Sequence, residues 1–254
     1  QRTSSTLPAG DLMAMRRAPS RVAPIENAPQ VFDFPRDIQP VLDRLCVDCH
    51  GYEQTARGGP NAGRLILSGD HGPMFSHSYY SMTIARLFSD GRNQPKSNYP
   101  PRTLGSSASR VLKMLDGDHF GVIATELEKK KLRLWIETGA PYPGTYAALG
   151  GGMIGGYAEN RQVGLDHDWP EARAATEVVN RRCAECHEGR TILPRTLCDE
   201  RGLSFWKPDM ADQRLRFSRH VVFNLTRPEK SLMLLAPLAK EAGGFGSCKQ
   251  DNGV

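Results

Sequence analysis

Two short stretches of the chain share the pattern Cys-x-x-Cys-His, whose spacing points most directly to chemistry. They comprise Cys46, Cys49 and His50 in the first half, and Cys183, Cys186 and His187 in the second. A c-type haem needs two thiols that form thioethers with its vinyl groups and one imidazole that binds the iron. This spacing supplies all three within one turn of chain, so the sequence predicts two covalently bound haem c groups.

Zinc binding and dithiol redox chemistry are the alternatives for such cysteine pairs. A four-cysteine zinc site usually separates its two pairs by about 15 to 20 residues, whereas these pairs lie in separate halves of the chain, each followed by His. A thioredoxin-like pair belongs beside a strand, and neither motif has that context. Haem attachment is the favoured interpretation.

The ligand on the far side of each iron decides whether a haem transfers electrons or binds a substrate. The five histidines outside the motifs are His71, His77, His119, His167 and His220. His119 lies between two predicted helices after the first motif, and His220 holds the equivalent place in the second half. The predicted iron ligands are therefore His50, His187, His119 and His220.

Other distal ligands stay open. His71 and His77 flank a loop and are alternatives to His119, and His167 is a further candidate. Met114 and Met233 are the best thioether alternatives, but both lie among leucines at helical spacing, which is typical of a core. An isolated histidine is also more often a surface or hydrogen-bonding residue than a ligand.

The elements before the motifs are predicted helices. Pro35 suits a first helical position, and Ile38, Leu42 and Leu45 fall on one face of a helix that runs into Cys46. In the second half, a helix from about 170 to 182 leads into the second motif.

The elements after the motifs are short helices in long loops. We expect helices at about 80–88 and 107–115, and a longer one that begins at Thr125 with a capping box to Glu128 and ends at Gly139. A late helix is predicted at 227–239, after Pro228.

The order of helix, motif, loops and helix therefore occurs twice. We expect a mostly α fold of two small cytochrome c-like haem domains with long loops and little β-structure. Residues 1–30 form an extended leader or linker, residues 31–145 the first haem c domain, and residues 146–254 the second. The Gly- and Pro-rich stretch 140–156 is the predicted boundary.

Composition narrows the class of protein. Hydrophobic residues make up 39% and aromatic residues 7% of the 254 residues, a modest number of apolar side chains for two cores. A haem in each half would add apolar surface to its core. The net charge of +5 comes without a long Lys/Arg run, so we expect acidic redox partner proteins and no nucleic acid. No apolar run approaches the roughly 18 residues of a membrane span.

Haem attachment takes place outside the cytoplasm, which predicts a periplasmic, extracellular or equivalent oxidising compartment. A signal peptide is then expected to have been removed, or the chain is part of a longer precursor.

Three stretches resemble the C-terminal di-haem region of hydrazine synthase alpha-subunit-like proteins of the planctomycete type. They are Phe-Asp-Phe-Pro-Arg-Asp-Ile-Gln-Pro-Val-Leu-Asp-Arg-Leu-Cys at 32–46, Phe-Ser-His-Ser-Tyr-Tyr at 75–80 and Asn-Leu-Thr-Arg-Pro-Glu-Lys-Ser at 224–231. In that family the region follows a β-propeller, and a segment similar to 14–21 links the two. The resemblance therefore implies that Gln1 is a cut end.

The resemblance also implies an enzymatic alternative. In true hydrazine synthases one haem of this region belongs to the active site: its motif histidine faces a zinc ion, and a tyrosine shortly after the motif binds iron. The corresponding tyrosine here is Tyr52, two residues after His50.

Three hypotheses for function follow. The leading one is an electron relay between redox partners, within a larger assembly, a homo-oligomer or a haem-linked filament. The second is a catalytic haem module of the hydrazine synthase type, a haem-dependent oxidoreductase acting on small nitrogen compounds. The third is a structural or redox-sensing domain.

The two remaining cysteines generate a prediction of their own. Cys198 and Cys248 form an even pair in a chain expected in an oxidising compartment, so we predict a disulfide between them rather than two free thiols. Mass spectrometry of the unreduced protein should detect their peptides linked. Alkylation of both thiols without prior reduction would contradict it.

Overall fold

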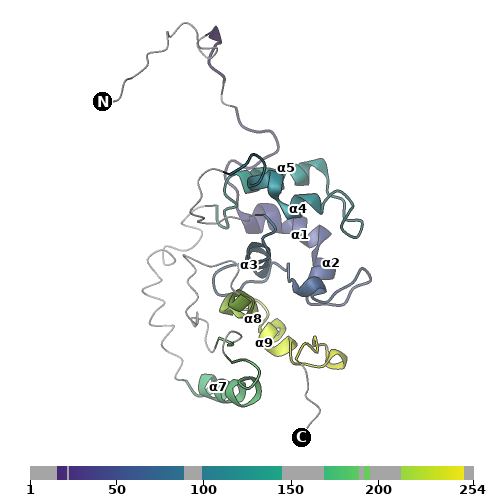
Figure 1. The fold of residues 1–254 in the computed structure, drawn as a ribbon, viewed down its shortest axis with the longest axis vertical. Helices are drawn as coiled ribbons and strands as arrows, with labels where there is room; N and C mark the ends of the chain where they lie inside the picture. Colours follow the sequence, from purple (N-terminus) through teal and green to yellow (C-terminus); the bar gives the residue numbers. More distant parts are fainter. Residues whose placement is uncertain are drawn as a thin grey trace, which may run out of the picture. The chain divides into compact units, whose positions relative to one another are not determined.

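The computed structural model describes residues 16–21, 23–88, 99–144, 169–188, 192–194 and 213–248. Regular structure in these residues is helical, with isolated β-bridges but no strand (Figure 1). This confirms the mostly α fold class. Within the described residues, no helix combines the length and the apolar character needed to cross a bilayer.

The α-helices of the described residues are mostly short. They are α1 (Gln39–Leu45), α2 (Val47–His50), α3 (His77–Ile84), α4 (Arg110–Lys113), α5 (Glu126–Glu137), α7 (Pro170–Cys183), α8 (Arg219–Val222) and α9 (Leu232–Leu235). Tighter or wider turns flank them: a π-helical η3 (Phe34–Ile38) and the 3₁₀ segments η4 (Ala62–Arg64), η5 (Gly105–Ala108), η8 (Gln213–Phe217), η9 (Pro228–Lys230) and η10 (Lys240–Ala242).

The helical path into the first motif is confirmed. Asp33 caps η3 by accepting a hydrogen bond from the Arg36 backbone N–H, and η3 continues into α1. The predicted apolar face is buried, with Ile38 0%, Leu42 1% and Leu45 7% exposed. Its burial fixes the helix that carries Cys46 at its end.

The capped helix is also confirmed. Thr125 and Glu128 form the predicted capping box at the start of α5, and Gly139 follows its end with a φ of +92°. Where one helix was predicted at 107–115, the chain forms two shorter elements, η5 and α4. The helix predicted at 80–88 is α3, which begins earlier because the Ser76 side chain caps it.

An aromatic cluster joins these elements into one core. The Phe34 ring lies 5.2 Å from Tyr79 and 5.3 Å from Trp135, and the Tyr79 ring lies 4.9 Å from Tyr142. Trp135 is fully buried and donates its indole N–H to the Pro141 carbonyl at 2.8 Å. These contacts connect the helix before the first motif to α3 and α5.

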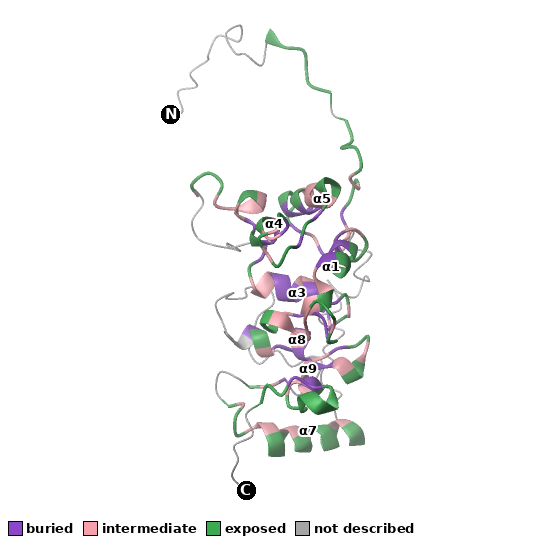
Figure 2. Cartoon of the chain, turned by 90° about the vertical axis from the view of Figure 1, so that its right-hand side faces the viewer, coloured by how far each residue is buried: buried purple, intermediate pink, exposed green. Residues whose placement is uncertain are grey.

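The helix predicted before the second motif is α7, which confirms the prediction. None of its residues is buried, whereas purple buried residues run through α1 and α3 (Figure 2).

The single helix predicted at 227–239 is wrong. The chain forms η9 and α9, separated by Ser231, whose ψ of 134° is extended. The Ser231 hydroxyl accepts a hydrogen bond from the Asn224 N–H at 3.0 Å, a tertiary contact that interrupts the helix.

Contacts divide the chain into two units, Gln1–Gln30 and Val31–Val254. The predicted boundary between 145 and 146 lies outside the described residues. In the larger unit, α8 packs against α3, so part of the C-terminal half contacts the first half.

Loss of the α5 cap tests the fold. Thr125→Ala should lower the free energy of unfolding by about 1 kcal/mol, because it removes the side-chain acceptor of the first turn. Thr125→Ser keeps the hydroxyl and serves as the control. Urea unfolding measures both, and equal stability of Thr125→Ala and the parent protein would contradict the role of the cap.

Candidate functional site

The first Cys-x-x-Cys-His motif folds as one helical turn. The backbone N–H groups of His50 and Cys49 donate to the Cys46 carbonyl at 2.9 and 3.1 Å. Cys46 packs against the main core, and burial raises the pKa of its thiol to about 11. The Cys49 thiol donates to the Arg57 carbonyl at 3.1 Å. Both thiols and the imidazole thus belong to one turn of chain, as the sequence predicted.

The His50 ring has a defined tautomer. Its Nδ1 lies 2.8 Å from the Ala62 carbonyl, which only accepts, so Nδ1 donates and Nε2 carries the lone pair. Burial lowers the pKa of His50, which favours the neutral imidazole. A backbone carbonyl on Nδ1 is the usual partner of a histidine that binds metal through Nε2. Sequence reasoning missed Ala62, because no local pattern marks this loop contact.

His119 lies beside His50. Their ring centroids are 6.0 Å apart and their planes differ by 14°. The two rings are thus nearly parallel, as in a stacked pair. The chain after α4 brings a second imidazole next to the motif histidine. Met114 packs on the edge of the main core, as its helical spacing indicated.

His77, an alternative distal ligand, uses both ring nitrogens within the protein. Its Nε2 donates to the Phe223 carbonyl at 2.9 Å, so Nδ1 accepts a hydrogen bond from the Tyr52 hydroxyl. Burial lowers the pKa of His77, consistent with a neutral ring. No lone pair of His77 is left for iron in this arrangement. His71, the other alternative, bonds through Nδ1 to the Gly72 carbonyl.

Tyr52 is 4% exposed, and its hydroxyl is bound to His77. The Arg227 guanidinium carbon lies 5.4 Å from the centre of its ring. Burial raises the pKa of Tyr52 above its ordinary value, and the nearby Asp70 carboxylate raises it further. These contacts hold Tyr52 as a protonated hydrogen-bond donor.

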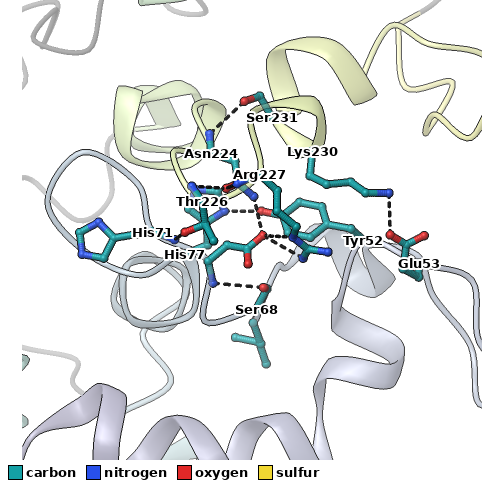
Figure 3. A network of polar contacts seen from close by, with 12 residues as sticks. Tyr52, Glu53, Ser68, His71, His77, Asn224, Thr226, Arg227, Lys230 and Ser231 are labelled. Carbon is teal, nitrogen blue, oxygen red and sulfur yellow. Dashed lines mark hydrogen bonds and ion pairs between the residues drawn. The ribbon is translucent and has the colours of Figure 1, made fainter.

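A polar network surrounds this tyrosine (Figure 3). Asp70 accepts hydrogen bonds from Asn224 at 2.6 Å and from Arg227 at 2.8 Å. The Asn224 side-chain oxygen accepts from the backbone N–H groups of Thr226 and Arg227, which shapes the turn. Lys230 pairs with Glu53 at 2.6 Å. The stretch 224–231, notable in the sequence only for its resemblance, is thus fixed to the loop after the first motif.

The second motif has fewer described contacts. The His187 N–H donates to the Cys183 carbonyl at 2.9 Å, and the His187 ring lies 5.7 Å from the ring of Phe217. Cys183 is half-buried and Cys186 is exposed. Partial burial raises the pKa of Cys248, and the nearby thiols of Cys183 and Cys186 raise it further. The end of the described chain therefore lies near the second motif.

His220 is 4% exposed, and its ring contacts Tyr80 and Phe75 of the first half. Burial lowers its pKa to about 3, which keeps the imidazole neutral at neutral pH. Phe217, three residues before His220, contacts His187. No described ring contact joins His220 to His187 itself, so its role as the second distal ligand stays a prediction. His167 and Cys198 lie outside the described residues.

Among the described residues, no group of three or more His, Cys, Asp and Glu side chains could hold a bare metal ion. A haem iron needs only one or two protein ligands, because the porphyrin supplies the others. The chain matches no protein-family model, no curated protein and no solved structure.

The buried His77 generates a pH prediction. Its pKa is lowered in the folded state, so the unfolded chain binds more protons below its ordinary pKa of about 6.5. The contribution of neutral His77 to stability is complete above that pH and is lost as the pH falls through the folded-state pKa. Urea unfolding at pH 7 and pH 5 should show a loss of at most about 1.4 kcal/mol per pH unit from this residue.

The variant His77→Gln tests this assignment. It should be less stable than the parent protein at pH 7, and its stability should fall less between pH 7 and pH 5. His71→Gln, at an exposed ring, is the control. An unchanged pH dependence in His77→Gln would contradict the assignment.

Proposed function

We propose that this protein is a di-haem c-type cytochrome that relays electrons between redox partner proteins. The observation that carries the proposal is the pair of nearly parallel imidazoles of His50 and His119, 6.0 Å apart, beside two thiols of a Cys-x-x-Cys-His turn. The haems would supply one-electron oxidation and reduction of iron.

The residues of the first site have separate tasks. Cys46 and Cys49 would attach the haem, and His50 and His119 would be the ligands of its iron. The Ala62 carbonyl holds the His50 ring in the tautomer that this requires. Phe120 and Ile123, 90% and 66% exposed, follow His119 in the chain and offer apolar surface for a haem to cover.

The second site follows the same plan. Cys183 and Cys186 attach the haem, and His187 binds the iron from one face. His220 is the proposed ligand of the other face, since it is a buried, neutral imidazole three residues from a side chain that contacts His187. Two bis-histidine haems would be low-potential centres, because it is a methionine ligand that raises the potential.

An electron relay is favoured over a catalytic haem. A catalytic haem needs an open iron position, and the His119 ring, 6.0 Å from the His50 ring, supports a sixth ligand at the first iron instead. Tyr52, the residue through which a hydrazine synthase-like site would bind iron, donates its hydroxyl to His77 instead. The redox partners, the larger assembly and the oxidising compartment belong to this proposal.

Covalent attachment is tested by the motif cysteines. Cys46→Ala and Cys183→Ala should each lower the pyridine haemochrome absorbance from two haems per chain to one. Any haem that stays at the altered motif should be extracted by acid acetone. Thr125→Ser, outside both motifs, should keep two haems. Metal analysis that finds zinc and no iron in the parent protein would refute the proposal.

The distal ligand of the first haem is tested by His119→Ala. This variant should open one iron, which becomes high-spin and binds carbon monoxide when reduced, and added imidazole should restore the low-spin spectrum. Met114→Leu is the matched control and should leave both haems low-spin. Two low-spin haems with unchanged potentials in His119→Ala would show that the ligand is another residue.

A further inference from the structure

We infer that the first half of the chain carries a recognition surface for the segment 213–248, and that the segment binds there even when the chain between them is cut. The residues of this surface come from the loop after the first motif and from the region of α3: Tyr52, Ile66, Asp70, His71, Gly72, His77 and Tyr80. The inference does not depend on a bound haem. It makes 213–248 a part of the body that holds the first motif, and it places the second motif on an insertion, residues 145–212.

Charge recognition is concentrated at the start of the turn 224–231 (Figure 3). The Asp70 carboxylate accepts hydrogen bonds from the Asn224 amide at 2.6 Å and from the Arg227 guanidinium at 2.8 Å. The Asp70 side chain is only 11% exposed, so water screens these contacts less than it would at an open surface. Because hydrogen bonds to charged groups are stronger than neutral ones, Asp70 is the main polar determinant of the surface.

The backbone of the first half contacts the same part of the segment. The His71 carbonyl accepts from the Leu225 N–H at 2.8 Å, and the His71 N–H donates to the Thr226 hydroxyl at 2.9 Å. The His77 Nε2 donates to the Phe223 carbonyl at 2.9 Å. Each bond uses a particular residue of the segment, so a shift by one residue would lose all three. The surface therefore selects one register.

Gly72 allows the two backbones to approach closely. A Cβ on this residue would lie 2.8 Å from the His220 carbonyl, which is too close for van der Waals contact. On the other side of His220, the Ser218 hydroxyl donates to the Tyr80 hydroxyl at 2.9 Å, directly before α8. Isolated helices as short as α8 are unstable in water, so its conformation depends on this surface.

An apolar contact completes the surface. Tyr52 and Ile66, 4% and 3% exposed, form a buried cluster with Leu235 and Phe245 of the segment. Burial of apolar side chains drives association, and the polar bonds fix the register. A buried apolar part beside specific hydrogen bonds is also the composition of interfaces between separate proteins.

A cut chain tests whether the segment binds without its connection. Recognition sequences of a site-specific protease are placed in the full-length chain, one within 145–168 and one within 195–212, and the purified protein is cleaved. We expect the fragment that contains 213–248 to coelute with the fragment that contains 31–144 in size-exclusion chromatography. Separation of these two fragments under native conditions would overturn the inference.

Two substitutions test the surface itself. Asp70→Asn removes its charge, and Gly72→Ala adds a methyl group against the His220 carbonyl. Each should weaken binding of the cut segment about tenfold, measured by fluorescence anisotropy of a dye at the segment's new N-terminus. Asp116→Asn is the matched control, because it loses an ion pair to Lys129 within the first half, and it should bind like the parent protein.

The dissociation constants decide the outcome. Equal values for Asp70→Asn and Asp116→Asn, or a parent-like value for Gly72→Ala, would refute the recognition surface. If Asp70→Asn does not accumulate, Thr226→Val replaces it, because that change on the segment removes the acceptor of the His71 N–H. It should weaken binding severalfold, and an unchanged dissociation constant would count against the surface.

Discussion

The two hydrogen bonds of His77 are the interaction on which the arrangement of the first candidate site, α3 and α8 depends. One connects α3 to Tyr52, two residues after the first iron ligand, and the other connects it to the backbone directly after α8. A neutral imidazole is required, because one nitrogen donates and the other accepts. Burial, which lowers the pKa of His77, maintains that state, and the Asp70 network fixes the neighbouring turn.

Local features of the fold could be predicted from the sequence because they depend on neighbouring residues. The turn of the first motif, the apolar face of α1 and the capping box at Thr125 are set by spacing and side-chain type. The expectation that His119 faces the first motif also came from its place between two helices. Each of these features involves residues that are close in the sequence or belong to consecutive elements of the chain.

Long-range features could not be predicted in the same way. The Ala62 carbonyl behind His50 and the Tyr80 ring beside His220 have no local signature, and their roles depend on how distant segments pack. The break at Ser231 has the same cause: its hydroxyl is used by Asn224, so a segment with helical spacing forms two short turns. The contact between Tyr80 and His220 is one of those that give α8 its position on α3.

The central claim is that one iron lies between His50 and His119. Anomalous diffraction from crystals of the holoprotein at the iron absorption edge tests it most directly. The account predicts two iron peaks per chain, one of them on the line that joins Nε2 of His50 to Nε2 of His119. A chain without iron, or an iron at the first motif with His119 turned away from it, would contradict the account.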